Sequence, residues 1–312
     1  MGKGRVVWGR PVLQVLKAES VLPDFECRGL STKGKIDWIH RHTDEGEIYL
    51  VCSRWEPVEQ IECVFRVEGK VPELWDPVTG QIREAGSYRQ ADGRTIVPLR
   101  MDPCGSVFVV FRKPTTEMQR SGKNWSEYQS VQEVAGPWQV DFDPAWFYPV
   151  PSGMTNTTVM FNSLVDWATR PEAAVKYYSG RATYRKEFDI SAKIGSRMLA
   201  ASHTNQEAVT TNQERLFIDL GDVREVAAVR LNGKDLGVLW AKPFRVEVTG
   251  IIKVGANRLE IDVANLWPNR LTGDAFQPKG ERRTHTNVIK YTQNTQCVSS
   301  GLLGPVKVTE VE

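Results

Sequence analysis

Residues 216–274 hold a succession of strand patterns and tight turns, and this segment constrains the fold more than any other part of the chain. Apolar runs lie on both sides of Asn232-Gly233, the dipeptide that best accepts the positive φ values of a two-residue hairpin turn. Further on, residues 244–249 and 258–263 alternate apolar and polar side chains. Because a period of two is typical of half-buried strands, the segment predicts antiparallel β structure.

The region from residue 34 to residue 113 also predicts short strands separated by turn signals. The strand patterns are residues 36–40, 47–52, 61–67, 71–74, 95–99 and 107–112. Many short strands with regular turns between them are typical of an antiparallel sandwich. Residues 114–133 have little periodicity and predict a linker, so residues 134–312 form a second domain.

Three further expectations concern segments outside these strands. Residues 5–8 predict a short strand, and Pro11 with the apolar residues that follow it predicts one amphipathic helix. The first and last strand patterns of the second domain, residues 138–143 and 305–311, are expected to pair and to bring its ends together. The polar stretch 196–214 predicts a mobile loop.

The stretch after the last alternating strand, which is expected to be a loop, combines aromatic, amide and charged side chains, which suits a sugar ligand. The candidates for sugar binding are Trp240, Trp267, Asn269, Arg270 and Asp274, with Tyr177 and Tyr178 as further rings of a platform. Indole and phenol rings pack against the C–H faces of pyranoses, while amide, guanidinium and carboxylate groups supply donors and acceptors for hydroxyls. Two alternatives stay open: the rings fill the core, or Arg270 and Asp274 pair to hold the turn.

These motifs resemble the sugar-binding jelly-roll domain of family 2 glycoside hydrolases, and most of all the version at the C-terminus of family 106 α-L-rhamnosidases. The resemblance rests on the runs AVRLNGKDLGVLW, PFRVEVT, GANRLEIDV and NLWPNRLTGD, with YYSGRATYRKEFDI upstream and SSGLLGPVKV downstream. The runs IDWIHRHTDEGEIYLVCSR and PELWDPVTGQIREA resemble the smaller β domain that precedes the jelly roll. Together they cover nearly all of the chain.

The resemblance implies an all-β fold of two antiparallel β-sandwich domains, preceded by a short α/β remnant. Residues 1–33 resemble the last strand and helix of a (β/α)₈ catalytic barrel, and residues 34–113 a small β-sandwich. After the linker at 114–133, residues 134–312 resemble a galactose-binding-like jelly roll. The other seven units of such a barrel, with the glutamates assigned to catalysis in this family, have no counterpart in the sequence. No catalytic residue is therefore carried over.

Charge and hydropathy argue against two classes of partner. The 40 basic and 38 acidic residues leave a net charge of +2, and no basic run is interleaved with aromatics, so nucleic acid is not expected as a partner. The apolar runs are shorter than the roughly 20 residues that a helix needs to cross a bilayer, so no membrane partner is expected. The first residues lack the apolar core of a signal peptide, whereas the resemblance implies an exported bacterial enzyme. The localisation therefore stays open.

Cysteine and histidine spacing predicts no metal site. The five cysteines, an odd number without a CxxC pair, predict buried free thiols rather than a disulfide framework or a zinc site. His40 and His42 lie two residues apart on one predicted strand face, but no third ligand is spaced to complete a site. They are expected to be structural or to face a barrel domain. No cofactor is expected. Jelly rolls often hold a structural calcium ion, but the sequence shows no loop of acidic residues that would bind one.

Three hypotheses for the function follow. In the first, the chain is the C-terminal portion of an α-L-rhamnosidase-like glycoside hydrolase, non-catalytic alone, which binds carbohydrate or completes the active site of a barrel domain. In the second, it is a small glycoside hydrolase that uses two carboxylates at the interface of its sandwiches. The available carboxylates, whose spacing singles out no pair, include Asp141, Asp143, Asp166, Glu172 and Asp274. In the third, it is a structural module that contacts a barrel or another copy of itself.

Overall fold

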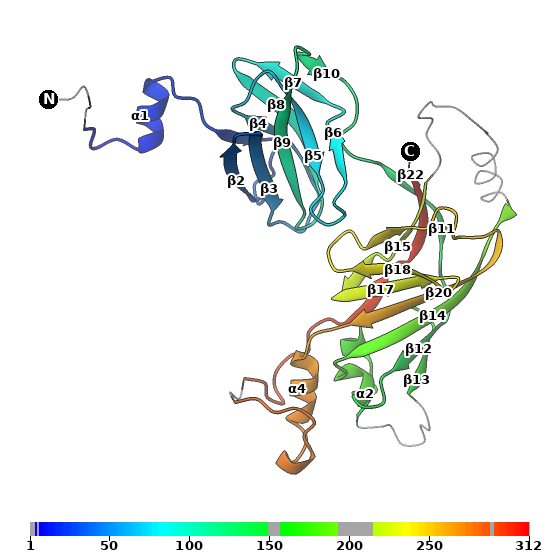
Figure 1. Cartoon of the computed structure of the whole chain (residues 1–312). Coiled ribbons are helices and arrows are strands. Elements are labelled where there is room, and N and C mark those ends of the chain that lie inside the picture. The colour runs from blue at the N-terminus through cyan, green and yellow to red at the C-terminus, as the bar shows by residue number, and fades with distance from the viewer. Residues whose placement is uncertain (1–3, 5, 149–156, 193–214, 288–289, 312) are drawn as a thin grey trace. The chain divides into compact units, whose positions relative to one another are not determined.

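The structure, a computed structural model, describes residues 4, 6–148, 157–192, 215–287 and 290–311. The chain divides into two compact units, Met1–Ser126 and Glu127–Glu312 (Figure 1). Each unit contains antiparallel sheets and a hydrophobic core of its own. The prediction of an all-β fold with two antiparallel sandwiches is therefore confirmed.

The first unit begins with a single short helix. α1 (Val12–Ala18) follows Pro11, which occupies the N-cap position. Every side chain of α1 is at least partly exposed. Residues 6–8 belong to no described strand, so the strand predicted at residues 5–8 is wrong in its described part. An apolar run becomes a strand only when a neighbouring strand satisfies its backbone hydrogen bonds.

Two five-stranded sheets form the rest of the first unit. One sheet contains, in spatial order, β1 (Phe25–Arg28), β4 (Glu59–Phe65), β8 (Arg94–Met101), β7 (Tyr88–Ala91) and β10 (Gln119–Arg120). The other contains β2 (Ile36–Thr43), β3 (Gly46–Ser53), β9 (Ser106–Pro114), β5 (Lys70–Trp75) and β6 (Ile82–Glu84). The six strand patterns predicted between residues 36 and 112 all coincide with strands and are confirmed. Aromatic rings from both sheets fill the core, with Tyr49, Phe65 and Phe111 in mutual contact.

The described part of the second unit contains a six-stranded sheet, a four-stranded sheet and a separate pair of strands. The six-stranded sheet contains, in spatial order, β13 (Thr158–Phe161), β12 (Trp138–Phe142), β14 (Arg181–Ile190), β20 (Gly255–Ala264), β17 (Val226–Leu231) and β18 (Lys234–Leu239). The four-stranded sheet contains β11 (Tyr128–Glu133), β22 (Lys307–Val311), β15 (Leu216–Asp219) and β19 (Arg245–Glu247). The pair consists of β16 (Asp222–Arg224) and β21 (Gly301–Gly304).

The helices described in the connections of the second unit are short. They are η1 (Trp167–Thr169), α2 (Ala173–Lys176), α4 (Pro268–Asp274) and η2 (Lys279–Glu281). Within the described ranges, none of the helices has both the length and the apolar character needed to cross a membrane.

The hairpin predicted at Asn232-Gly233 is confirmed and joins β17 to β18. Both turn residues have positive φ, 53° and 80°, as a two-residue turn of this kind requires. The alternation predicted for the strand beside this hairpin is confirmed as well, because Leu259, Ile261 and Val263 of β20 are buried. One face of β20 is therefore part of the core.

The pairing expected between the two end strands of the second domain is wrong. β12 pairs with β13 and β14, whereas β22 pairs with β11 and β15. A strand pattern shows which residues extend, but the choice of partner depends on tertiary packing. β10 and β11 both lie within the segment 114–133 for which a linker is expected, and the unit boundary falls between Ser126 and Glu127. The stretch 196–214 lies outside the described residues.

Candidate functional site

Helices α2 and α4 lie at the same end of the six-stranded sheet (Figure 1). Strand β14 starts after α2 and strand β20 ends before α4, and the register places Arg181 of β14 opposite Ala264 of β20. Residues 268–274, predicted as part of a loop, form α4 instead. Pro268 lies in the first turn of this helix, where the fixed φ of proline suits a helix start.

Trp267 precedes α4 as its N-cap residue and is 50% exposed. Its ring meets that of Trp146 edge to face, with the centroids 4.9 Å apart and an interplanar angle of 77°. Trp146 is half-buried and packs against the hydrophobic core. An edge-to-face contact fixes the orientation of a ring while leaving part of it open. We call Trp146 and Trp267 the tryptophan pair.

Asn269 is buried and connects α4 to the segment before β21. Its side-chain amide donates to the carbonyl of Val298 at 2.8 Å and to the hydroxyl of Ser300 at 3.0 Å. Its Oδ1 accepts from the N–H of Val298 at 2.8 Å. Both ends of the amide are thus engaged inside the chain, and Asn269 anchors α4.

Arg270 and Asp274 form a buried ion pair within α4, with Nη2 and Oδ1 2.8 Å apart. Arg270 also donates from Nη1 to the carbonyl of Tyr148 at 2.6 Å. Asp274 accepts from the N–H and the hydroxyl of Thr284 at 2.7 and 2.6 Å. Burial lowers the pKa of Arg270, and the carboxylate of Asp274 counteracts this shift. The alternative in which Arg270 and Asp274 pair to hold their segment is therefore what the structure shows.

Trp240 directly follows β18 and is 61% exposed. Strands β18 and β20 run in the same direction, since each is antiparallel to β17. Trp240 and Trp267 therefore each follow the last residues of a strand, and these two strand ends lie at the same end of the sheet. Of the five residues predicted to bind sugar, these two tryptophans are exposed and the other three are buried.

The two tyrosines before β14 differ in their surroundings. Tyr178 is buried in the core, and its hydroxyl donates to the carbonyl of Arg181 at 2.6 Å. Tyr177 is half-buried, and its ring lies 5.6 Å from that of the exposed Phe276. Sequence reasoning missed Phe276 and Trp146. The two residues lie in separate connections, so no spacing in the sequence relates them. The aromatic run at residues 146–148 is the one sequence feature that could have indicated Trp146.

Several carboxylates considered for catalysis are engaged with neighbours in the chain. Asp141 forms an ion pair with Arg185, and Glu172 forms one with Arg170 at 2.6 Å. Asp166 caps η1 by accepting from a backbone N–H of that helix. Such partners are typical of structural carboxylates, whereas a glycosidase needs an acid and a second carboxylate on either side of a sugar bond.

His40 joins two carboxylates in the first unit. Its Nδ1 lies 2.9 Å from Asp24 and its Nε2 lies 2.8 Å from Glu47. Its ring stacks on that of Tyr49, with the centroids 3.9 Å apart. His42 contacts the same Glu47 carboxylate. Among the residues that the structure covers, no group of three or more His, Cys, Asp or Glu side chains is arranged for a metal ion.

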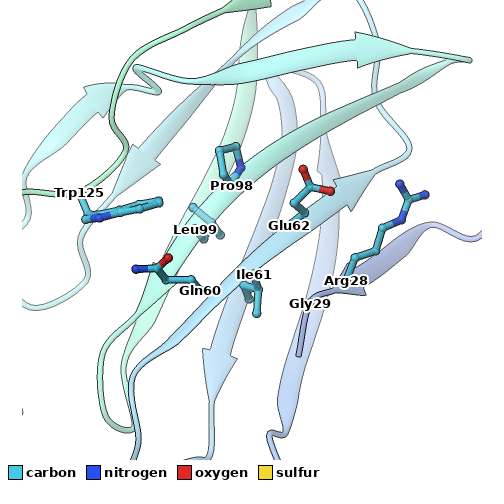
Figure 2. A pocket seen from close by; sticks show the side chains of 8 residues that line it. All are labelled: Arg28, Gly29, Gln60, Ile61, Glu62, Pro98, Leu99 and Trp125. Atoms are coloured by element: carbon cyan, nitrogen blue, oxygen red, sulfur yellow. The ribbon is translucent and has the colours of Figure 1, made fainter. Parts of the chain in front are cut away.

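A hollow of about 330 Å³ lies beside strands β4 and β8 of the first unit. Figure 2 shows Trp125 at one end of this hollow and Arg28 with Glu62 at the other, with Pro98 between them. Its volume is at the lower end of the range for small-molecule sites. Because Trp146 orients the half-exposed ring of Trp267, we place the candidate site at the tryptophan pair rather than at this hollow.

Comparisons with known proteins give this geometry a family context. The sequence model of glycoside hydrolase family 106, described as alpha-L-rhamnosidase, matches residues 1–90. A rhamnosidase structure from Novosphingobium sp. PP1Y matches 99% of this chain with a TM-score of 0.79 and 35% identity. A protein provisionally named beta-glucuronidase, from Formosa agariphila, is 36% identical over 199 residues, which are 56% of this chain.

The chain spans only part of these proteins. It covers 27% of the rhamnosidase chain and 15% of the Formosa agariphila protein. A beta-glucuronidase structure from Ruminococcus gnavus also matches, at 15% identity and a TM-score of 0.37 over 61% of this chain and 30% of that chain.

Proposed function

We propose that this chain, which is related to the α-L-rhamnosidases of glycoside hydrolase family 106 and corresponds to a part of such enzymes, binds carbohydrate without cleaving glycosidic bonds on its own. The observation that carries the proposal is the tryptophan pair. Trp267 is half exposed, and its ring meets that of Trp146 edge to face. An exposed, oriented indole is suited to stacking on a pyranose ring.

The buried polar residues of α4 support this role. Asn269 ties the helix to Val298 and Ser300, and Arg270 ties it to the carbonyl of Tyr148. A platform that is held in place before the ligand arrives loses less conformational entropy on binding. Because one or two rings on an open surface bury little apolar area, we expect a dissociation constant on the order of 1 mM.

The non-catalytic part of the proposal rests on the surroundings of the carboxylates. Hydrolysis of a glycoside ordinarily uses two carboxyl groups roughly 5–9.5 Å apart. Asp274 is buried against Arg270, and Asp141 is paired with Arg185. We therefore assign glycoside hydrolysis to the parts of such an enzyme that lie outside this chain. The chain covers 27% of the Novosphingobium rhamnosidase.

We also propose that α1 contacts that remainder. Its large apolar side chains Val12, Leu13 and Leu16 are exposed, and a contiguous apolar patch is typical of a contact surface. The segment lies within the residues that match the rhamnosidase family. A second copy of this chain is the alternative partner, and an oligomer that grows with protein concentration would support it.

The test pairs activity with binding on the purified chain. Hydrolysis is assayed on 4-nitrophenyl α-L-rhamnoside, β-D-glucuronide and β-D-galactoside, and the parent sugars are titrated by calorimetry. We expect no hydrolysis, and we expect heat of binding for at least one sugar, which Trp267→Ala removes. Trp8→Ala is the matched control, because Trp8 is 84% exposed and lies in the other unit.

The other outcomes distinguish the remaining hypotheses. Hydrolysis by the purified chain would overturn the non-catalytic part. Binding that survives Trp267→Ala but not Trp240→Ala would move the site to the end of β18. Binding of none of the sugars would overturn the carbohydrate proposal and favour the structural role.

A further inference from the structure

Cys27 and Cys63 lie directly opposite each other on neighbouring antiparallel strands of the first unit. Cys27 belongs to β1 and Cys63 to β4, and the register pairs their Cα atoms. Residues opposite each other in an antiparallel pair project to the same face of the sheet. Cys63 is fully buried in the core of this unit, and the partly buried Cys27 packs against that core.

The hydrogen-bond pattern of these strands brings the two cysteines close. The N–H of Arg66 donates to the carbonyl of Asp24 at 3.0 Å, and these two residues continue the same register. Opposite residues alternate between hydrogen-bonded and non-hydrogen-bonded pairs, so Cys27 and Cys63, three residues further along, form a non-hydrogen-bonded pair. In such pairs the Cα atoms lie about 4.5 Å apart, within the range of about 4.4–6.8 Å found for disulfides.

The proximity of the two thiols makes them unequal. The neighbouring Cys63 thiol lowers the pKa of the Cys27 thiol. The Cys27 thiol and burial raise the pKa of Cys63. Because the thiolate is the reactive form of cysteine, the more accessible Cys27 is the group that meets an oxidant first.

We propose that Cys27 and Cys63 form a cross-strand disulfide when the chain meets oxidised glutathione. The Cys27 thiolate attacks one sulfur of the glutathione disulfide, which forms a mixed disulfide and releases one glutathione thiolate. The Cys63 thiol passes its proton to that thiolate. The resulting Cys63 thiolate attacks the Cys27 sulfur and releases the second glutathione as a thiolate, which takes up from water the proton that Cys27 gave up on ionising. Two protein thiols are thereby oxidised to one disulfide, and one glutathione disulfide is reduced to two thiols.

The other three cysteines lie in different surroundings. Cys52 of β3 lies opposite Ser106 of β9, Cys104 is exposed after β8, and Cys297 is partly buried in the second unit. All five cysteines are free, as predicted, but only Cys63 is buried. Spacing along the chain does not reveal which strands pair, and the pairing decides which two cysteines meet.

Peptide mapping of the whole chain tests the proposal. The protein is incubated with reduced and oxidised glutathione, alkylated with iodoacetamide in urea to trap free thiols, and digested with trypsin. Cys27, Cys52 and Cys63 fall in three separate tryptic peptides, residues 18–28, 42–54 and 55–66. We expect peptides 18–28 and 55–66 to be joined and peptide 42–54 to be alkylated.

A stability measurement supplies a second readout. The crosslink closes residues 27–63 into a loop and restricts the unfolded chain, so the first unit should melt roughly 5–10 °C higher than in the reduced protein. Cys27→Ser, at the partly exposed position, should abolish this difference without disturbing the core. Cys52→Ser is the matched control and should retain it.

Two results would overturn the proposal. One is that iodoacetamide alkylates both Cys27 and Cys63 at a ratio of oxidised to reduced glutathione at which the exposed Cys104 already carries glutathione. The other is a stable mixed disulfide of Cys27 with glutathione, which would show that Cys63 cannot reach it.

Discussion

Trp146 and Trp267 meet edge to face across two separate connections of the second unit, with their ring centroids 4.9 Å apart. Trp146 precedes β13, and Trp267 precedes α4. Since Trp146 packs against the core and Trp267 is half exposed, the inner ring fixes the orientation of the outer one. This relationship connects the packing of the sandwich to the surface at which we expect a sugar to bind.

Trp146→Ala should weaken sugar binding less than Trp267→Ala does. The exposed indole stays in place but loses an aromatic contact worth roughly 0.5–1.5 kcal/mol. The dissociation constant should therefore rise about 2- to 10-fold, as measured by calorimetric titration. Trp146→Phe keeps an aromatic ring at this position and should bind as the unaltered chain does. Unchanged affinity in Trp146→Ala would show that Trp146 does not orient the platform.

The buried ion pair of Arg270 and Asp274 should contribute strongly to the stability of the second unit. Arg270→Met leaves the Asp274 carboxylate buried without its charged partner, and Asp274→Leu does the same to the guanidinium. Each single change should lower the free energy of unfolding by about 3–5 kcal/mol, as measured by urea denaturation. The double variant should lose less than the sum of the two single losses, because it leaves no unpaired charge.

An exposed ion pair in the same unit is the control for this prediction. Arg215 and Glu247 also contact each other, but their side chains are 48% and 40% exposed. Arg215→Met should change the free energy of unfolding by no more than about 1 kcal/mol. Losses of equal size for Arg270→Met and Arg215→Met would contradict a special role for the buried pair.

The strands and the hairpin could be predicted from the sequence because their signals are local. Asn232-Gly233 between two apolar runs predicts a hairpin by itself, and the alternation in residues 258–263 places Leu259 and Ile261 on the buried face. Each of these features depends only on neighbouring residues.

The environment of α4 depends on distant residues, and the sequence did not reveal it. Asn269 and Arg270 were interpretable as ligand-facing groups because amides and guanidinium groups bind sugars. Their partners Val298 and Tyr148 lie in other connections and carry no motif. Pro268 after Trp267 was the one local sign of a helix start. The positions of Trp240 and Trp267 directly after strands can be predicted from local patterns. The burial of the polar side chains of α4 cannot, because it depends on residues that are distant in the sequence.

Gly273 lies where α4 packs against Tyr177. A Cβ atom at this position would lie 2.5 Å from the Cβ of Tyr177 and 2.7 Å from Nη2 of Arg270. Gly273→Ala should therefore displace α4 and lower the free energy of unfolding by about 1–3 kcal/mol, although alanine favours a helix by up to about 1 kcal/mol. Urea denaturation measures the change.

Gly280→Ala is the control for this packing effect. A Cβ atom there would meet no atom within 4 Å, so the free energy of unfolding should stay within about 0.5 kcal/mol of that of the unaltered chain. A Gly273→Ala variant as stable as Gly280→Ala would show that α4 tolerates the added methyl group.

Glu260 should make the stability of the second unit depend on pH in the acidic range. Three arginines surround its carboxylate: Arg185 at 3.1 Å, Arg230 at 3.3 Å and Arg258 at 2.8 Å. Burial raises the pKa of Glu260, but the hydrogen bonds from these arginines outweigh it, so the pKa in the folded state lies below the usual value. Folding therefore favours the ionised carboxylate.

The direction of the pH effect follows from that lowered pKa. Glu260 contributes its full stabilisation above the unfolded-state pKa of about 4.3 and loses it as the pH falls through the folded-state value. Thermal unfolding from pH 6 to pH 3 should therefore show a shallower acidic fall in Glu260→Gln than in the unaltered chain, together with lower stability at pH 6. Asp262, whose pKa is also lowered although burial alone would raise it, keeps part of the acid dependence.

Glu281→Gln, at an exposed position in η2, should follow the unaltered chain at every pH. Parallel curves for Glu260→Gln and the unaltered chain would mean that the arginines stabilise this carboxylate no more than water does.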